Sequence, residues 1–409
     1  MSASPPIPAP QAGIRPPLYV SLVTETFPPE INGVANTLRH MRDGLLAASH
    51  RVQLVRPRQA TEAKDRDQDT PSPQDLVLTQ GLPIPGYPGL HFGLPAGGTL
   101  DKLWRSQRPD LVYIATEGPL GRSALSSATR LGIPTLSGMH THFDRYSRHY
   151  RLGLIAPLVA AYMRGFHNRS GGTLVPTRAM AESLRRSDFE RIHIWPRGVD
   201  AGLFNPARRS EQLRAAWGLK PDQLALIYVG RLAPEKNVEL TLQSYLAIKA
   251  ELPGTRMIWV GDGPARRHLE QACPDGHFAG ARTGEDLASH YASGDLFLFP
   301  SLTETFGNVV LEAMASGLPV LAYRDAAAAE LINSGHNGRT VRPGNSVDFV
   351  ATGMELANNR DLCRRLGRAA REQALRHAWP HLIDDLIALF QRSVLEHQHA
   401  PMAGSAVRL

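Results

Sequence analysis

Short apolar runs rich in β-branched residues alternate with stretches of helical periodicity along most of the chain. Most positions within each run are apolar, which is typical of parallel strands that are covered on both faces. Such alternation of strands and helices indicates right-handed βαβ units and doubly wound parallel sheets. The predicted helices include 34–49 and 238–252, and the predicted strands are 18–24, 51–57, 111–116, 133–139, 172–177, 224–230, 256–262, 295–301 and 318–323.

The same strand–helix plan occurs in both halves of the chain and indicates two Rossmann-like domains. A chain of 409 residues exceeds what one hydrophobic core usually serves. Ligands of doubly wound sheets bind beyond the carboxyl ends of the strands, so we expect the site in a cleft between two facing sheets. We divide the chain into a disordered proline-rich tail, an N-terminal domain, a C-terminal domain, a helix that returns to the first domain, and a second tail: 1–16, 17–205, 206–380, 381–395 and 396–409.

Composition argues against a membrane-spanning protein and against a disulfide-stapled one. No segment approaches the ~20 consecutive apolar residues that span a bilayer, and the N-terminus lacks the apolar stretch of a signal peptide. The two cysteines, Cys273 and Cys363, lie far apart and show no metal-ligand spacing. This cysteine usage fits a reduced, cytoplasmic setting.

All of the net charge of +7 lies in residues 1–205, and this basic half predicts an anionic partner. Because the chain has no RNA-binding signature and no lysine-rich run, we expect a peripheral contact with an anionic membrane surface and no nucleic acid. Ordinary surface arginines explain the charge equally well. Residues 145–169 carry arginines at both ends of an apolar middle. That pattern fits either a helix at a lipid interface or a core helix with solvated flanks.

The segment 300–320, PSLTETFGNVVLEAMASGLPV, carries the strongest chemical signal. A strand ends at its start, and a helix begins near Gly307, so that free helix amides offer an anion site flanked by Phe306 and Asn308. Glu312 lies about one turn into the helix, where its carboxylate can accept two hydrogen bonds from a vicinal diol such as a ribose. Glu304, before the helix, can reach a neighbouring hydroxylated group. The alternative is an ordinary amphipathic helix with a surface glutamate.

Two loops that follow strands of the second half add phosphate-binding character. In VGRLAPEKN, Arg231 and Lys236 flank a turn, and two cations there would stabilise the negative charge that grows on a departing diphosphate. Alone, this spacing is more typical of a solvated turn. In VGDGP, Gly261 and Gly263 permit close backbone approach. Without a third glycine they favour a nucleotide-facing turn over a dinucleotide fingerprint.

The first half contributes two further candidates at strand ends. In PPEINGV, Gly33 opens a helix N-terminus suited to a phosphate or a sugar hydroxyl, although a tight βα loop explains the motif as well. In SGMHTHFDRY, His140 follows a strand and could hydrogen-bond a sugar hydroxyl or neutralise charge near the reacting carbon. His142 and His149 are interpreted as buried structural histidines. A metal site is not favoured, because His140 and His142 are spaced i,i+2 and no acidic third ligand lies nearby.

A metal ion is not required by this set of residues. Asp65 and Asp67 match the D-x-D motif of metal-dependent transferases. Because they lie in the polar segment 61–75, we interpret them as solvent-exposed charges. Arg231, Lys236 and the helix amides suffice for a diphosphate. We therefore expect neither a metal nor a cofactor apart from the nucleotide-sugar substrate.

Together these segments resemble glycosyltransferase family 4 from about Leu18 to about Leu389. The resemblance implies the GT-B fold, an α/β architecture of two facing Rossmann-like doubly wound parallel-sheet domains, and retention of anomeric configuration. It further implies that the position of Glu312 binds the nucleotide ribose and that of Glu304 the donor sugar. It implies that Arg231 and Lys236 are the pair that binds the diphosphate. Gly33 is the implied donor-loop contact, and His140 is the implied catalytic histidine of the cleft.

Within the family, EINGVANTLRHMRDGL and TETFGNVVLEAMASGLPV look like bacterial GDP-mannose-dependent mannosyltransferases that act on lipid-linked acceptors, and like related sulfolipid-type enzymes. Two loops depart from the common pattern. Asn32–Gly33 stands where many members have paired glycines. RDAAAAELI, residues 324–332, replaces a Gly-Gly turn near the donor sugar.

The expected activity is transfer of a hexose, in first place mannose, from a nucleotide diphosphate sugar to a hydroxyl acceptor of the glycolipid or lipid-linked kind. The donor is expected to be GDP-mannose, with a UDP-sugar as the alternative. Competing interpretations are a sugar-nucleotide epimerase or glucan synthase on the same fold, or a non-catalytic nucleotide-sugar or lipid-binding protein. An NAD oxidoreductase is excluded, since G-x-G-x-x-G is missing from the first βα turn.

Overall fold

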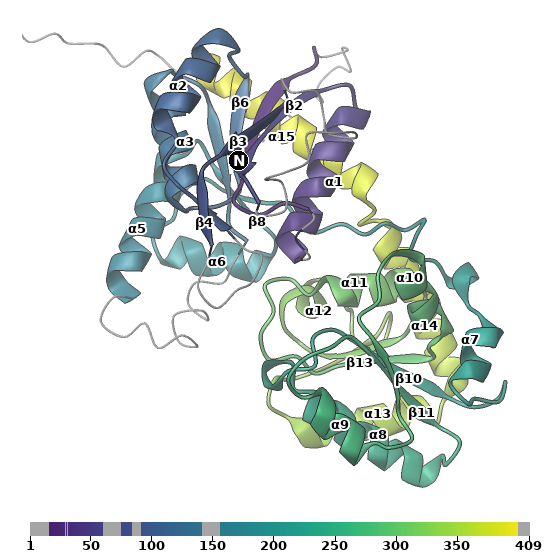
Figure 1. Ribbon diagram of the computed structural model, residues 1–409. Helices are drawn as coiled ribbons and strands as arrows, with labels where there is room; N and C mark the ends of the chain where they lie inside the picture. The colour runs from purple at the N-terminus through teal and green to yellow at the C-terminus, as the bar shows by residue number, and fades with distance from the viewer. Residues whose placement is uncertain are drawn as a thin grey trace, which may run out of the picture.

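The computed structural model describes residues 16–28, 30, 32–59, 75–83, 91–140 and 156–399, which form two α/β domains (Figure 1). The N-terminal domain is built on a seven-stranded sheet in which all neighbouring strands run parallel. Its spatial order is β3 (Leu76–Thr79), β2 (Arg51–Pro57), β1 (Tyr19–Val23), β6 (Leu111–Ile114), β7 (Thr135–Gly138), β8 (Thr173–Val175) and β9 (Ile192–Ile194). The described helices of this domain are α1 (Gly33–Ala47), α2 (Gly97–Ser106), α3 (Pro119–Arg130), α5 (Ala156–Arg169) and α6 (Arg178–Arg186). A separate antiparallel hairpin joins β4 (Gly81–Pro83) to β5 (His91–Gly93).

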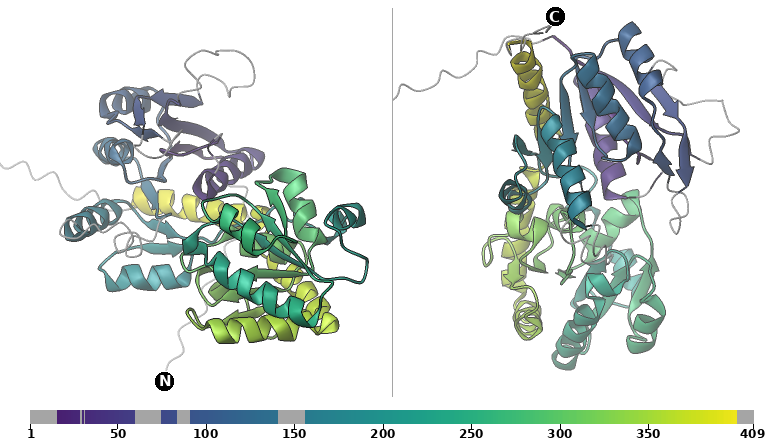
Figure 2. Two further views of the ribbon diagram at one scale, coloured as in Figure 1. Left: turned by 60° about the horizontal axis from the view of Figure 1, so that its bottom comes forward. Right: turned by 90° about the vertical axis from the view of Figure 1, so that its left-hand side faces the viewer.

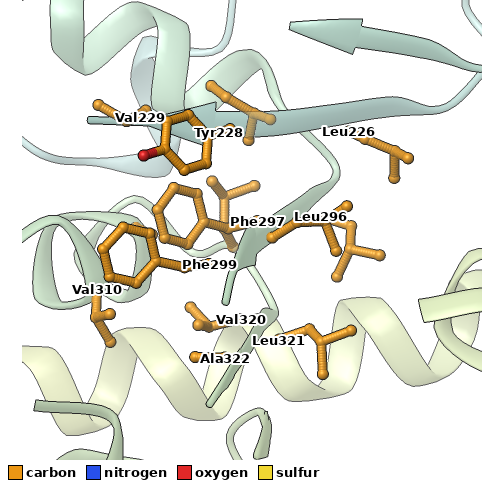
Figure 3. Packing of buried hydrophobic residues seen from close by; sticks show 14 of the residues in the cluster. Leu226, Tyr228, Val229, Leu296, Phe297, Phe299, Val310, Val320, Leu321 and Ala322 are labelled. Atoms are coloured by element: carbon orange, nitrogen blue, oxygen red, sulfur yellow. The ribbon is translucent and has the colours of Figure 1, made fainter. Parts of the chain in front are cut away.

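The C-terminal domain has a second parallel sheet, with six strands and the same winding. Its spatial order is β12 (His277–Gly280), β11 (Arg256–Val260), β10 (Ala225–Val229), β13 (Leu296–Phe299), β14 (Val320–Tyr323) and β15 (Arg339–Val341). Its helices are α7 (Glu211–Ala216), α8 (Val238–Glu251), α9 (Arg266–Ala272), α10 (Gly284–Ser293), α11 (Asn308–Ala315), α12 (Ala326–Leu331), α13 (Ser346–Ala357) and α14 (Arg360–Leu375), with short 3-10 turns η3 (Pro206–Arg208) and η4 (Pro234–Lys236). Figure 3 shows the aromatic and aliphatic side chains of β10, β13 and β14 packed between the sheet and its helices.

The chain passes between the domains twice, and the two passages lie side by side. Val199 pairs with Ala378 in an isolated parallel bridge, after which the last helix, α15 (Trp379–His399), returns to the N-terminal domain. The indole Nε1 of Trp195 donates to the carbonyl oxygen of Leu382 at 2.9 Å. Figure 2 shows α15, in yellow, running along the N-terminal domain.

Consecutive residues of the central N-terminal strands face two separate apolar clusters. Leu22 of β1 and Tyr113 of β6 lie in the cluster that includes residues of α1 and α15, whereas Val23 and Val112 lie with residues of α2 and α3. Both faces of the sheet are therefore buried. This burial explains why the sequence shows continuous apolar runs rather than alternation.

Every strand predicted from an apolar run is present, and so are the predicted parallel sheets. The strands that were not predicted are β3, β9, β12 and β15, which are the edges of the two sheets, and β4 and β5 of the hairpin. The final helix differs from its predicted bounds 381–395: it begins at Trp379 and runs to His399, so 396–399 belong to the helix rather than to the tail. Residues 1–15 and 400–409 of the predicted tails lie outside the described residues.

Candidate active site

The strand order of each sheet defines a switch point at which ligands of doubly wound folds bind. The order reverses between β1 and β6 in the first sheet and between β10 and β13 in the second. The loops after β10 and β13 carry Arg231, Lys236 and Glu304, and the loop after β1 leads to Gly33. The predicted residues therefore follow the carboxyl ends of the strands where doubly wound sheets bind their ligands.

Lys236 and Glu304 meet across the switch point of the C-terminal sheet. The Lys236 ammonium lies 2.5 Å from Oε1 of Glu304 and 3.1 Å from the carbonyl oxygen of Thr303, to both of which it donates. Ser301 donates to the same carboxylate oxygen at 2.9 Å. The carboxylate thus holds the lysine over the loop that leads into α11, where an incoming anion would share the charge.

Arg231 takes a different position from Lys236, because its side chain is 66% exposed and pairs with Glu235 one turn further along the chain. Its own backbone is fixed, since the hydroxyl of Tyr228 donates to the Arg231 carbonyl oxygen at 3.0 Å. An exposed guanidinium on an anchored backbone can turn toward a bound anion without moving the loop. Each cation of the predicted pair is therefore balanced by its own carboxylate, and their shared role at a diphosphate stays a prediction.

Two helix N-termini, one from each domain, lie close together. Gly307, at φ 89°, is the N-cap of α11 and supplies no side-chain cap to the first amides of that helix. A Cβ built on Gly33, the first residue of α1, would lie 3.6 Å from Nδ2 of Asn308. Both helix ends carry partial positive charge, which favours an anion between them. Phe306 differs from its neighbours, because its side chain is 4% exposed and lies in the core, so only its backbone borders this region.

Glu312 sits on the partly exposed side of α11 and accepts a hydrogen bond at 2.9 Å from the hydroxyl of Tyr291 on α10. Burial raises the pKa of Glu312 to about 7, and the Tyr291 hydrogen bond opposes that shift. Tyr291 is itself fully buried. The tyrosine therefore orients one carboxylate oxygen and leaves the other for a ligand.

Gly261 and Gly263 have a packing role in this fold. A Cβ on Gly261 would lie 2.0 Å from the carbonyl oxygen of Gly230, and one on Gly263 would lie 2.4 Å from that of Leu232. Both glycines have positive φ, at 132° and 155°. They allow the loop after β11 to press against the loop that carries Arg231, which explains the two glycines without a direct nucleotide contact.

His140 follows β7 on the N-terminal sheet and is 7% exposed. Nη2 of Arg197 donates to its Nδ1 at 2.6 Å, and Nε2 lies 3.4 Å from the hydroxyl of Tyr113. Burial, and then the Arg197 guanidinium, hold the pKa of His140 well below its usual range. The low pKa favours a neutral imidazole, and both predicted roles of His140, a hydrogen bond to a sugar hydroxyl and the neutralisation of charge near the reacting carbon, stay predictions.

Several functional neighbours were not found from the sequence. Arg197 lies near the predicted domain boundary at 205/206 and in no predicted site motif, and Tyr291 carries no local motif at all. Both become visible only through the contacts of His140 and Glu312. Among the predicted residues, hydrogen bonding joins Lys236 to Glu304.

Other predicted features concern metals, thiols and membranes. Asp65, Asp67, His142 and His149 lie outside the described residues. In the part of the chain that the structure describes, no three His, Cys, Asp or Glu side chains are grouped to hold a metal ion. Both cysteines are free and buried. Of the helices that the structure describes, none combines the length and apolarity of a bilayer span.

Comparison with known proteins adds independent information. Family models described as Glycosyltransferase Family 4 and as Glycosyl transferases group 1 match residues 31–203 and 223–359. The chain is 33% identical to the GDP-mannose-dependent alpha-mannosyltransferase of Mycobacterium tuberculosis over 91% of this chain and 96% of that protein. It is 27% identical to the alpha-monoglucosyldiacylglycerol synthase of Acholeplasma laidlawii over 78% of this chain and 84% of that protein.

The solved structure of sucrose-phosphate synthase from Thermosynechococcus elongatus superposes with a TM-score of 0.73 at 19% identity, covering 92% of this chain and 98% of the other. At that identity the match concerns the fold alone. Together with the two parallel sheets, it confirms the predicted α/β fold of the GT-B type.

Proposed function

The chain belongs to glycosyltransferase family 4 and is a glycosyltransferase, and from this premise we propose that it transfers mannose from GDP-mannose to a hydroxyl group of a lipid-linked acceptor. The observation that carries the proposal is the meeting of Lys236 and Glu304 beside the uncapped N-terminus of α11. The mannose and guanosine parts rest on the similarity to the mycobacterial enzyme over nearly its whole length.

On the donor side, the C-terminal domain binds the nucleotide. Glu312 accepts hydrogen bonds from the ribose diol through the oxygen that Tyr291 leaves open. Arg231, Lys236 and the first amides of α11 stabilise the diphosphate, whose negative charge increases as the glycosidic bond breaks. Glu304, held by Lys236 and Ser301, accepts a hydrogen bond from the sugar.

We propose transfer with retention, by attack from the face that the diphosphate leaves. The acceptor oxygen forms a bond to the anomeric carbon while the bond from that carbon to the phosphate oxygen breaks. The acceptor proton passes to the departing phosphate. In this scheme the protein supplies binding, orientation and charge stabilisation, and His140 donates a hydrogen bond to the transferred sugar.

The acceptor is proposed to be lipid-linked, and the N-terminal domain to contact an anionic membrane surface. The relative from Acholeplasma laidlawii is named for a diacylglycerol product. All of the net positive charge lies in residues 1–205, and α5 presents Leu158, 72% exposed, on the same helix as Arg164 and Arg169. Sedimentation with anionic liposomes tests this part, since binding that fails to weaken in high salt would contradict it.

A thermal-shift screen of GDP-, UDP- and ADP-sugars tests the donor, because a ligand that prefers the native state raises the melting temperature. GDP-mannose is expected to give the largest shift. A larger shift with a UDP-sugar would replace the proposed donor. Product analysis with labelled donor then separates a transferase from an epimerase, which converts the sugar without an acceptor.

A further inference from the structure

Arg197 is a buried guanidinium in the segment that leads from β9 to the C-terminal domain, and it is 4% exposed. Its described hydrogen bond is the one to Nδ1 of His140. Among the described ion pairs none involves Arg197. Burial lowers the pKa of Arg197, and the neighbouring Tyr113 opposes that shift. Burying a cation away from the carboxylates of the described residues costs several kcal/mol. A structural role in packing would be served better by an apolar side chain.

The hydrogen bond from Arg197 determines the tautomer of His140. A guanidinium has only N–H donors, so Nδ1 of His140 must be the acceptor. The single proton of the neutral ring is then on Nε2. That nitrogen lies 3.4 Å from the hydroxyl of Tyr113 and beside Gly138, where a Cβ would come within 2.6 Å of it. Arg197 therefore holds the ring at its Nδ1 edge. At the Nε2 edge, Gly138 has no side chain and leaves space for the ring.

The position of the cation also affects the strength of the donor. The positive charge of Arg197 stands at the Nδ1 edge and polarises the ring toward it, which makes the Nε2 proton a better donor in a site of low dielectric. The groups that act electrostatically on His140 from the described elements around it are Arg197, Tyr113 on β6 and His167 on α5. Arg197 is the one of these that bonds the ring at short distance.

We propose that Arg197 is the positioning residue of His140, which fixes the Nε2–H tautomer and keeps the imidazole neutral so that it donates to an oxygen of the transferred sugar. This inference rests on the proposed function for the part played by the sugar. It goes beyond that function by assigning the tautomer and the residue that sets it.

The test is NMR of the full-length protein labelled with 15N-histidine, with His140→Gln to assign the His140 signals. The wild type is expected to show Nε2 protonated and Nδ1 unprotonated, with no titration of His140 between pH 8 and 5.5. Arg197→Met should release the ring into a mixture of tautomers that titrates. Arg197→Lys keeps a cationic donor and should restore the wild-type tautomer. Arg186→Met, the same substitution at an exposed position of α6, serves as the control.

Kinetics supplies the functional readout. In Arg197→Met we expect kcat to fall roughly tenfold or more, by the loss of a hydrogen bond to a charged group, with little change in the donor KM. Its pH profile should gain an acidic limb that the wild type lacks. A wild-type His140 that titrates near its ordinary pKa, or carries its proton on Nδ1, overturns the inference. So does an Arg197→Met protein whose tautomer is unchanged. The wild-type spectrum and Arg197→Lys decide the matter even if Arg197→Met does not fold.

Failure of the inference differs from failure of the proposed function. If His140→Gln retains full turnover while the wild-type tautomer is as expected, the catalytic part of the proposed function is wrong and the positioning stands. If His140→Gln abolishes turnover while the ring titrates freely, the positioning is wrong and the proposed function stands.

Discussion

The two sheets share one winding order, yet their switch points carry different chemistry (Figure 1). At the C-terminal switch point, Lys236 is paired with Glu304, and Arg231 is paired with Glu235. At the N-terminal one, Glu25 follows β1 and Glu117 follows β6. Glu25 accepts a hydrogen bond at 3.3 Å from the amide of Leu120 in the first turn of α3. Burial raises the pKa of Glu25 to about 7.

Under the proposed function, this difference corresponds to a division of labour between domains of one topology. Cations suit a departing diphosphate, whereas carboxylates accept hydrogen bonds from the hydroxyl groups of an acceptor. Glu117 also accepts at 3.1 Å from Nε2 of the buried His167, which anchors the acidic side of the N-terminal switch point. In this proposal one fold serves two binding roles, because the roles reside in loop residues rather than in the sheets.

The largest expected effect concerns Arg231, one of the cations at the C-terminal switch point. Arg231→Ala should lower kcat/KM about a hundredfold or more, since removing a preorganised charge donor costs about 2.7–4 kcal/mol in the transition state. Steady-state kinetics with saturating acceptor measures it. Arg282→Ala is the matched control, because Arg282 forms an i,i+4 pair with Asp286 just as Arg231 does with Glu235. Near-normal turnover of Arg231→Ala would remove that residue from the diphosphate site.

The acidic side is tested by the pH dependence of stability. Because the folded pKa of Glu25 is raised from 4.5 to about 7, the native state binds the proton more tightly than the unfolded chain. The stabilisation is present below pH 4.5 and is lost as the pH rises through 7, up to about 3 kcal/mol. Denaturant titrations at pH 5 and 8 should show this slope, and Glu25→Gln should reduce it, leaving the part contributed by Glu312. An unchanged slope in Glu25→Gln, with Glu182→Gln as the exposed control, would contradict the assignment.

Glu312 gives the next effect, on donor affinity. Glu312→Ala should weaken nucleotide binding about ten- to a hundredfold, since hydrogen bonds to a charged group contribute about 1.5–3 kcal/mol. Calorimetry measures the change, and unchanged affinity would exclude the ribose role. With its pKa near 7, the wild-type carboxylate should bind the diol more tightly as the pH rises from 6 to 8. Tyr291→Phe should move that midpoint upward, because the tyrosine hydrogen bond lowers the pKa of Glu312.

The smallest effect concerns the contact between the domains. Oε1 of Glu330 on α12 accepts hydrogen bonds from the amides of Arg178, at 2.8 Å, and Ala179, at 3.4 Å, in the first turn of α6. Glu330→Gln should weaken this interdomain contact by about 0.3–1 kcal/mol, the usual value of a carboxylate at a helix N-terminus. Distance measurement between labels on the two domains should show a small shift toward longer separations. Glu372→Gln, exposed on α14, should show none.

The sequence by itself determined the central strands of both sheets, the two-domain plan and the loops that follow β10, β13 and β7. Central strands are buried on both faces and therefore appear as continuous apolar runs. The edge strands β3, β9, β12 and β15 are only partly buried, so their apolar pattern is weak. Local motifs located Lys236, Glu304 and Glu312 because each lies in a strand-to-helix loop or the helix that follows it.

Only the tertiary structure decided the partners of those residues. Arg197 and His140 are 57 positions apart, Lys236 and Glu304 are 68 apart, and Glu25 meets Leu120 across 95. These pairs exist because the order of strands in each sheet brings distant loops to one edge. Protonation states follow from the same packing, since burial, together with neighbouring charges or hydrogen bonds, sets the pKa of His140, Glu25 and Glu312. A pattern along the chain records which segments are buried, but which charges face each other depends on how the strands are ordered in space.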